Sequence, residues 1–430
     1  MPASKRVAIF GLGYVGLPLI RACLNAGHTI IGFDIDQDKV DNLTNELSHV
    51  DDVTNDEIQD WLTRGFHPTT NSADLTDIDV FIMCVPTPLT KAGGPDLSAV
   101  ESATRTIEER LSNSTNARRL LPLVVLESTT YPGTTEEIVQ PILEKNGLIA
   151  AQDFNLAFSP ERIDPGNKTW TFENTPKVVG GLTTECTDAA EAFYAPMTTQ
   201  IVRTKGLKEA EMAKLLENTY RHVNIALVNE MAKLSHELGI DIWDVINAAE
   251  TKPYGFQAFR PGPGVGGHCI PIDPNYLSHR VKTELGQPFR FVELAQEINA
   301  SMPAYVVSRV RDLLNTNGIL INGARVLVMG VSYKANIADQ RETPATPVVR
   351  HLRRLGAEVF YMDPYVEEFT VDGQPVTSIT GPSSRERFDV AVILQAHHEF
   401  SSDRLSDLSE YWLDTSSGIT SASGTQCTRL

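Results

Sequence analysis

Apolar residues recur at two spacings along the chain, and these spacings predict its elements. An apolar run at residues 7–10 is followed by a glycine-rich turn, a helical pattern to about residue 25 and a second apolar run at 28–36. Further apolar runs follow at 80–86 and 121–129. Strands that are buried on both faces and alternate with helices form parallel sheets. The first part of the chain is therefore predicted to be a doubly wound parallel sheet.

Between residues 206 and 238 the pattern becomes helical without interruption, and it is helical again over residues 291–314. In the first of these segments apolar residues recur at steps of three and four: Met212, Leu215, Leu216, Tyr220, Val223, Leu227 and Met231. Strand-like runs restart with RVLVMG and continue with AEVFYMDP and FDVAVILQ, and the Ser/Thr-rich end predicts a loose tail. We therefore predict an α/β protein with two doubly wound domains joined by a central all-helical domain. The predicted boundaries are 1–203, 204–316 and 317–430.

Gly11, Gly13 and Gly16 form the motif G-L-G-Y-V-G between the first strand and the first helix. In this context the first glycine permits a tight turn, the second lets the backbone approach a pyrophosphate, and the third allows close packing of helix on strand. Asp34 ends the second strand, where a carboxylate can accept from a ribose 2′-hydroxyl and repel a 2′-phosphate. These features predict a Rossmann-like domain that prefers NAD to NADP. The alternative is a tight turn beside a surface acid.

Composition narrows the class of protein. A chain of 430 residues is too long for one core, and its formal charge of −18 argues against nucleic acid or an anionic membrane as a partner. We expect no signal peptide, since a strand-like run begins almost at once, and no apolar run reaches the roughly 20 residues of a membrane helix. The five scattered cysteines suit a reducing compartment. We therefore expect a cytoplasmic protein without a metal.

Two segments carry candidate chemistry. Cys269 stands in GVGGHCIPIDP, four residues before Asp273. Glycines let backbone N–H groups gather round a ligand, and such a loop can favour the thiolate of a nucleophilic cysteine. A small buried hydrophobic thiol is the alternative. Lys214, Asn218 and Arg221 share one face of the central helical segment, which predicts either one pocket or a solvated charged stripe.

Seven ordered motifs resemble those of the nucleotide-sugar 6-dehydrogenase family, which includes dehydrogenases of UDP-glucose, UDP-N-acetylglucosamine, UDP-N-acetylmannosamine and GDP-mannose. They are GLGYVG, CVPTP, ESTTYPGTT, SPERIDPG, EAEMAKLLENTYRHVNIALVNE, GVGGHCIPIDP and GVSYKANIADQRETP, and they run through almost the whole chain. The resemblance implies an NAD-dependent, four-electron oxidation of the C6 hydroxyl of a UDP-sugar to a carboxylate. The C-terminal domain would then bind UDP, and the product would serve polysaccharide biosynthesis.

The resemblance also implies roles for individual residues. The catalytic set would be Cys269 as nucleophile, with Lys214, Asn218, Asp273, Glu161 and Thr129. The NAD contacts would be Gly11, Gly13, Tyr14, Val15, Gly16, Asp34, Thr87, Thr129 and Arg341. The substrate contacts would be Glu161, Arg162, Ile163, Lys214, Asn218, Arg221, Arg260, Gly266, Tyr333 and Lys334. Because Arg260 matches an arginine that reaches a neighbouring subunit's substrate, we expect a homodimer or larger assembly built on the central domain.

Two details favour an N-acetylated hexosamine. In members that act on UDP-glucose a second glutamate usually follows the SPE glutamate by four residues, whereas Pro165 stands four residues after Glu161 here. SPERIDPG and PFRFVELAQEINASMP are also similar to the UDP-N-acetylglucosamine type. We therefore predict UDP-N-acetylglucosamine 6-dehydrogenase activity, with UDP-glucose and UDP-N-acetylmannosamine as alternative substrates.

Two other classes of function remain as alternatives. A two-electron 3-hydroxyacid or 6-phosphogluconate-type dehydrogenase has a similar layout but needs no thiol. A non-catalytic NAD-binding protein would not need Lys214, Asn218, Cys269 and Asp273 together. The thiol and the second α/β domain favour the four-electron enzyme.

Overall fold

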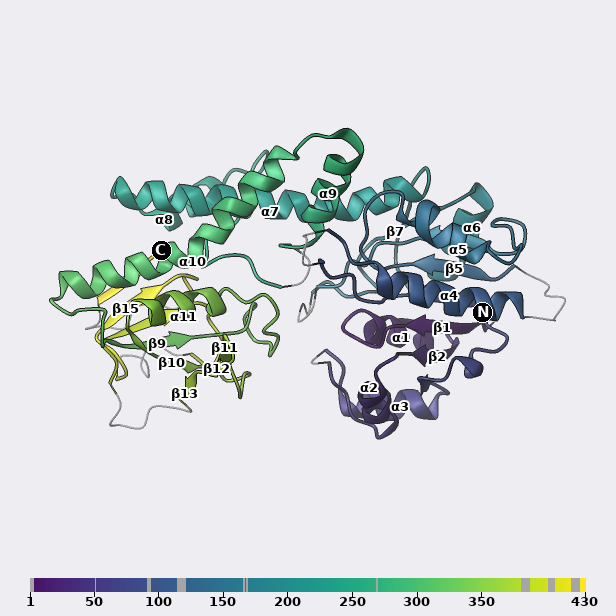
Figure 1. Cartoon of the computed structure of the whole chain (residues 1–430), viewed down its shortest axis with the longest axis horizontal. Coiled ribbons are helices and arrows are strands. Elements are labelled where there is room, and N and C mark those ends of the chain that lie inside the picture. Colours follow the sequence, from purple (N-terminus) through teal and green to yellow (C-terminus); the bar gives the residue numbers. More distant parts are fainter. Residues whose placement is uncertain are drawn as a thin grey trace. The chain divides into compact units, whose positions relative to one another are not determined.

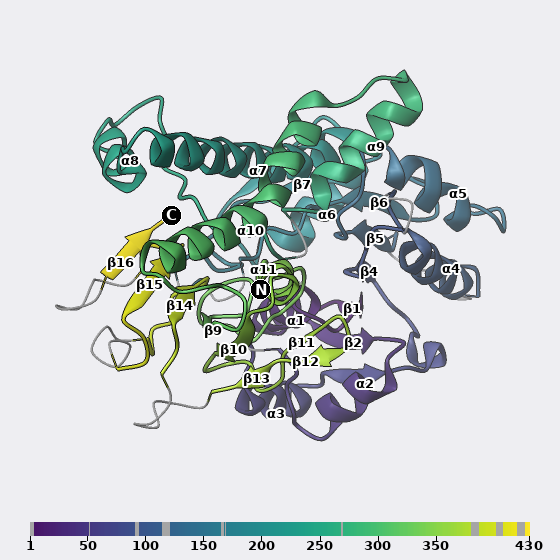
Figure 2. The same ribbon diagram turned by 60° about the vertical axis from the view of Figure 1, so that its left-hand side comes forward.

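The computed structural model describes residues 4–50, 52–90, 94–113, 121–164, 167, 169–267, 270–379, 387–400, 407–418 and 426–430. The chain divides into two compact units. The first consists of Met1–Glu217 and Asn275–Leu285, and the second of Asn218–Pro274 and Gly286–Leu430. Many elements of both units are labelled in Figure 1, and Figure 2 turns the same ribbon by 60° and labels some of the others.

An eight-stranded sheet forms the centre of the first unit. Its strands in spatial order are β3 (His67–Thr69), β2 (Thr29–Phe33), β1 (Arg6–Phe10), β4 (Val80–Met83), β5 (Leu123–Leu126), β6 (Asn155–Phe158), β7 (Lys177–Gly181) and β8 (Ile201–Arg203). All neighbours are parallel except β6 and β7. The chain order reverses between β1 and β4, which is where doubly wound sheets bind their ligands, at the carboxyl ends of the strands.

Both faces of this sheet are buried because successive strand residues point to opposite sides. In β1, Val7 and Ile9 join a core with α1 and α6, while Ala8 and Phe10 join a second core with α4. The helices and helical turns of this unit are α1 (Gly16–Asn25), α2 (Gln37–Thr44), α3 (Asn55–Thr63), η1 (Ser72–Asp74), α4 (Ser98–Ser112), η2 (Thr135–Val139), α5 (Gln140–Leu143) and α6 (Thr184–Tyr194).

A helical region separates the two sheet-forming parts of the chain. It comprises α7 (Leu207–Glu237), α8 (Ile242–Glu250), α9 (Asp273–Leu285) and α10 (Arg290–Thr316). The long helical pattern of the sequence is one continuous helix, α7, whose residues to Glu217 belong to the first unit. No helix among the described residues has both the length and the apolar character to cross a membrane.

The second unit contains a six-stranded parallel sheet. Its order is β13 (Thr377–Ser378), β10 (Glu358–Met362), β9 (Arg325–Met329), β14 (Val390–Ile393), β15 (Tyr411–Asp414) and β16 (Gln426–Arg429), beside the hairpin of β11 (Thr370–Val371) and β12 (Gln374–Pro375). Helix α11 (Ala345–Arg354) and the C-terminal half of α10 bury one face of this sheet, as Figure 1 shows. The predicted α/β class, with two largely parallel sheets and a helical region between them in sequence, is confirmed.

The expectation of a loose tail is wrong for the last residues. Residues 426–429 form β16, which pairs in parallel with β15, and Leu430 is buried in the core. An edge strand presents unpaired backbone groups, so even a polar segment can extend the sheet by pairing with them. Residues 419–425 lie outside the described part of the chain.

Candidate active site

The loop between β1 and α1 leaves space beside one of its three glycines. A Cβ on Gly11, which has φ +96°, would lie 2.6 Å from the carbonyl oxygen of Cys84, and one on Gly16 would lie 1.9 Å from that of Gly11. A Cβ on Gly13 would meet nothing within 4 Å. Packing therefore requires two of the glycines, and the third borders open space where a pyrophosphate could approach.

The start of α1 and the end of β2 complete this loop. The N-cap residue, Val15, supplies no side-chain hydrogen bond to the first turn, so the N-terminal N–H groups of α1 suit an anion. Asp34 is buried, and its carboxylate accepts from Leu12 N at 2.8 Å and from Asp36 N at 3.0 Å. Each carboxylate oxygen has a further lone pair for a ribose hydroxyl. The loop thus fits a dinucleotide cofactor.

Two predicted NAD contacts meet at the carboxyl ends of neighbouring strands. Thr87 follows β4 and Thr129 follows β5, and the Thr87 hydroxyl donates to the Thr129 carbonyl at 2.8 Å. Tyr14 and Val15, in the glycine loop, are half-buried. These residues lie at the end of the sheet where the chain order reverses.

A buried lysine–glutamate pair joins α7 to the segment after β6. Lys214 Nζ donates to the carbonyl of Glu161 at 2.6 Å and lies 3.2 Å from its Oε2. The backbone N–H of Ile163 donates to the other carboxylate oxygen. Arg162 pairs with Glu217 and donates to the carbonyl of Pro176. The tertiary structure thus brings together four of the predicted catalytic and substrate residues: Glu161, Arg162, Ile163 and Lys214.

In the second unit, the side chain of Asn218 is likewise bound to a buried carboxylate, that of Asp273. The amide of Asn218 donates to a carboxylate oxygen of Asp273, the first residue of α9, which is buried. Asn218 lies four residues after Lys214 on α7, and successive helical turns therefore carry a lysine and an asparagine, each bound to a buried carboxylate. Cys269 lies outside the described residues.

Two predicted site residues of the second unit, the substrate residue Tyr333 and the NAD contact Arg341, lie beside the glycine pair Gly266 and Gly267. A Cβ on Gly266 would lie 2.7 Å from Cβ of Tyr333, and the N–H of Gly267 donates to the carbonyl of Arg341 at 3.1 Å. The guanidinium of Arg341 binds the carboxylate of Asp339 through two nitrogens. Lys334 is half-buried, and its carbonyl accepts from the Ser332 hydroxyl. The loop that contains Gly266 and Gly267 therefore packs against residues 333–341.

Two predicted substrate arginines are exposed. Arg221 lies on the surface of α7, and Arg260 forms an exposed ion pair with Glu250 at 2.7 Å. Such pairs are weak, so the arginine can exchange its partner for a stronger anion.

Sequence reasoning missed a polar clamp in the second unit. Asp363 follows β10 as Asp34 follows β2, and its carboxylate accepts from Val331 N at 2.7 Å, which parallels the bond from Leu12 to Asp34. The ring of His397 bridges from Asp363 to Asn336 N, and both side chains of this pair are fully buried. The signal was an aspartate at the end of a strand, although the motif GxGxxG is absent here.

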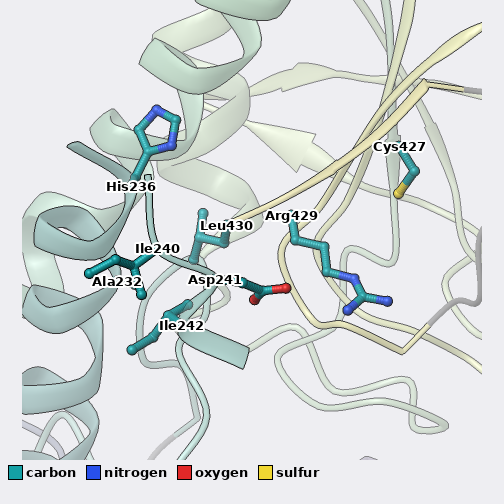
Figure 3. Close-up of a pocket in the computed structure, with 8 residues that line it drawn as sticks. All are labelled: Ala232, His236, Ile240, Asp241, Ile242, Cys427, Arg429 and Leu430. Carbon is teal, nitrogen blue, oxygen red and sulfur yellow. The ribbon is translucent and has the colours of Figure 1, made fainter. Parts of the chain in front are cut away.

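Two cavities of the second unit differ in their relation to these residues. One of about 510 Å³ is lined by Gly264, Val265 and Glu342, which adjoin Gly266 and Arg341 in sequence. The other, of about 380 Å³, lies between the end of α7, the start of α8 and β16 (Figure 3). None of the predicted site residues lines the second cavity. Within the described residues no group of three or more His, Cys, Asp or Glu side chains is arranged to hold a metal.

A Rossmann sheet with this glycine loop and a buried lysine–carboxylate pair defines an NAD-dependent oxidoreductase. Sequence models of the UDP-glucose/GDP-mannose dehydrogenase family match the chain with the NAD binding domain at residues 5–198, the central domain at 208–301 and the UDP binding domain at 327–417. The chain therefore belongs to the UDP-glucose/GDP-mannose dehydrogenase family, as the sequence motifs predicted.

Individual relatives are similar to this chain over most of its length. The chain is 37% identical to the UDP-N-acetyl-D-glucosamine 6-dehydrogenase of Pseudomonas aeruginosa over 398 residues, 92% of this chain and 91% of the relative. It is 38% identical to Protein CapL of Staphylococcus aureus over 362 residues, 84% of this chain and 82% of the relative. The structure of a UDP-D-ManNAc dehydrogenase of Pyrococcus horikoshii matches with a TM-score of 0.87 and 31% identity, over 99% of this chain and 98% of that one.

Proposed function

We propose that this enzyme oxidises the C6 hydroxyl of a UDP-N-acetylhexosamine to the carboxylate in two successive NAD-dependent steps. The observation that carries the proposal is the pair of functional groups on α7, Lys214 and Asn218, each held by a buried carboxylate. A two-electron alcohol oxidation needs one proton acceptor, whereas oxidation to an acid also needs stabilised oxyanions and an activated water.

NAD supplies the hydride acceptor, used twice for each substrate. Loss of hydride from C6 and of the hydroxyl proton gives an aldehyde, and the Cys269 thiolate adds to it as a thiohemiacetal. Loss of a second hydride gives a thioester, whose C–S bond breaks when water adds, releasing the carboxylate and the thiol. Lys214 and Asn218 stabilise the oxyanions, and Asp273 or Glu161 accepts a proton from the water.

Three of the other cysteines support Cys269 as the nucleophile. Burial raises the pKa of Cys23 and of Cys84, and a nearby Glu127 raises both further. Burial also raises the pKa of Cys427. A thiol with a raised pKa is mostly protonated at neutral pH and a poor nucleophile. Among the described cysteines, these three are therefore unsuited to attack an aldehyde.

For the sugar we propose the gluco isomer, with UDP-N-acetylmannosamine as the alternative. The Pseudomonas relative is named for the first and the Pyrococcus structure for the second, at similar identity. A panel of UDP-N-acetylglucosamine, UDP-N-acetylmannosamine, UDP-glucose and GDP-mannose tests this by kcat/KM. A highest value for UDP-glucose or GDP-mannose would exclude an N-acetylhexosamine as the preferred substrate.

Replacement of Cys269 tests the mechanism. Cys269→Ala should bind NAD and UDP-sugar normally but form no carboxylate, and Cys269→Ser should lose at least ~10³-fold in turnover. Wild-type enzyme should form two NADH for each uronate. The matched control is Cys427→Ser, which changes a half-buried thiol of β16. Near-wild-type uronate formation by Cys269→Ala would show that the thiol has no covalent role.

We further propose a cytoplasmic homodimer or larger assembly that serves polysaccharide biosynthesis. Support for the assembly comes from α7, on which Leu216, Leu227 and Leu234 are each more than half exposed. Isolated exposed leucines are ordinary, but a row of them along one helix marks an interaction surface. The predicted domain boundaries at residues 203 and 316, and the individual site residues, also remain proposals.

A further inference from the structure

A second buried lysine–glutamate pair lies in the first unit, formed by residues with no role in the mechanism above. Lys177 Nζ donates to Glu127 Oε2 at 2.8 Å, and both side chains are buried. The hydroxyl of Tyr194 donates to the other carboxylate oxygen. The ammonium also lies 5.3 Å from the ring centroid of Phe172 and 5.0 Å from that of Tyr194. The Lys177 ammonium is thus held by the Glu127 carboxylate and by the faces of two aromatic rings.

The start of β7, where Lys177 lies, binds the segment that carries Glu161. The three contacts are Ser159 Oγ to Val178 O at 2.7 Å, Lys177 Nζ to Pro160 O at 3.5 Å and Arg162 Nη1 to Pro176 O at 2.7 Å. Glu161 instead binds Lys214, through both its carbonyl and its carboxylate. Residues 159–162 are therefore fixed on two sides, to β7 and to α7.

Stability alone gives no reason for charges at this place. Removing a lysine and a glutamate from water costs several kcal/mol for each ion, and an apolar pair of similar volume is commonly as stable or more so. An ion pair, however, fixes direction, because its hydrogen bonds hold only at one geometry. Glu127 directly precedes the Ser128–Thr129 turn, so it links that turn to the segment of Glu161 through Lys177.

We propose that Glu127 and Lys177 are positioning residues that hold Glu161 in place against Lys214. The pair acts through the Pro160–Glu161 peptide, because Lys177 Nζ donates to the carbonyl of Pro160. This inference rests on the proposed function, because it assumes that Glu161 and Lys214 serve the reaction. Misplacement of a reacting group by about 1 Å can cost about 10²-fold in rate, so a small shift of Glu161 is enough to matter.

The test replaces both charges at once. Glu127→Gln with Lys177→Met leaves no unpaired buried charge, and the glutamine oxygen still accepts from Tyr194. The double variant should have a higher Tm than Lys177→Met alone, because the single variant buries an unpaired carboxylate. Its kcat should fall at least ~10-fold, while KM for NAD changes less than about threefold. The matched control is Glu136→Gln with Lys208→Met, which removes a pair of the same unit in which Lys208 is exposed and Glu136 half-buried, and it should leave kcat unchanged.

A cycle with Glu161→Gln separates positioning from general damage. If the pair acts through Glu161, the double change should cause no further loss of kcat in the Glu161→Gln background. A wild-type kcat in the double variant overturns the proposal, and so does a loss of equal size in both backgrounds. If the double variant does not fold, Glu127→Gln alone serves, and a wild-type kcat there has the same meaning.

The result does not depend on the identity of the sugar. Rates are compared on whichever nucleotide sugar the wild-type enzyme turns over best. A preference for a sugar other than a UDP-N-acetylhexosamine overturns the proposed substrate, while the ratio between variants still tests the pair.

Discussion

At the scale of single residues, we expect Asp34 to decide the choice between NAD and NADP. Its buried carboxylate would face a 2′-phosphate with like charge, and Lys39, whose Nζ lies 3.6 Å away, offsets only part of this. We expect kcat/KM for NAD to exceed that for NADP by at least ~100-fold, because a buried like-charge contact costs a few kcal/mol. Asp34→Asn removes the charge but keeps an acceptor for Leu12 N. It should therefore lower the ratio of kcat/KM for NAD to kcat/KM for NADP at least ~10-fold. Equal values for the two cofactors in the wild type would contradict the assignment.

Glu211 links stability to pH. Burial raises its pKa to about 7, even though its carboxylate accepts from Thr135 and from Gly133 N. In the unfolded chain a glutamate titrates near ~4.3. Between these two pKa values the folded state holds the proton on Glu211 and the unfolded chain does not. The protonated carboxyl therefore favours the folded state over the unfolded one, fully below about pH 4, and this contribution to the free energy of unfolding is lost as pH rises through 7. It amounts to on the order of 3 kcal/mol.

Glu211→Gln cannot titrate, which gives the measurement. The Tm of the wild type relative to Glu211→Gln should fall as pH rises from 5 to 8. The exposed Glu209, on the same helix, provides the control, since Glu209→Gln should show a constant difference from the wild type. A constant difference for Glu211→Gln as well would mean that Glu211 has no raised pKa.

At the scale of elements, the clamp of Asp363 and His397 holds the loop that follows β9. Burial by itself would raise the pKa of Asp363, but hydrogen bonds from His397 and from backbone N–H groups outweigh it and lower the pKa. The carboxylate is therefore ionised at neutral pH and binds the loop strongly at Val331, two residues before Tyr333. Loosening this loop should weaken binding of the nucleotide rather than the chemistry.

His397→Phe tests the clamp, because it keeps a ring but removes both nitrogens. KM for the UDP-sugar should rise about 10-fold, the effect of losing roughly one hydrogen bond to a charged group, while kcat changes less than about twofold. KM for NAD should stay the same. His398→Phe, at an exposed neighbouring position, is the control. A fall in kcat without a change in KM would assign the clamp to catalysis instead.

At the scale of the whole molecule, the proposed assembly rests on the exposed leucines of α7. Leu227 and Leu234 are exposed on one side of the helix. His236 is also exposed, but it lies on the side of the helix opposite to Leu227. Leu227→Glu with Leu234→Glu should weaken a dimer at least ~10-fold, because it places charges in an apolar contact. Light scattering over a range of concentrations measures this, and His236→Glu is the control for added charge. A wild-type enzyme that is monomeric and fully active would refute the assembly and the role of Arg260 in a neighbour's site.

The sequence by itself determined the features that depend on neighbours along the chain. Periodic apolar residues predicted α7 and half of the strands of each sheet, namely β1, β2, β4, β5, β9, β10 and β14. The glycines with Asp34 predicted the NAD loop, because these features rest on local geometry. The ordered motifs predicted the family. They could not predict the parallel pairing of β16, since a polar segment acquires its strand only from the edge it meets.

The tertiary structure alone decided burial and the partners of charged groups. It separates Leu215, fully buried, from its exposed neighbour Leu216, although both fit the same helical pattern. It also pairs Lys214 with Glu161 and Lys177 with Glu127, which lie 53 and 50 residues apart in sequence. A charge is stable inside a protein only beside an opposite charge and hydrogen-bonding groups, and the fold brings these together from distant strands and helices.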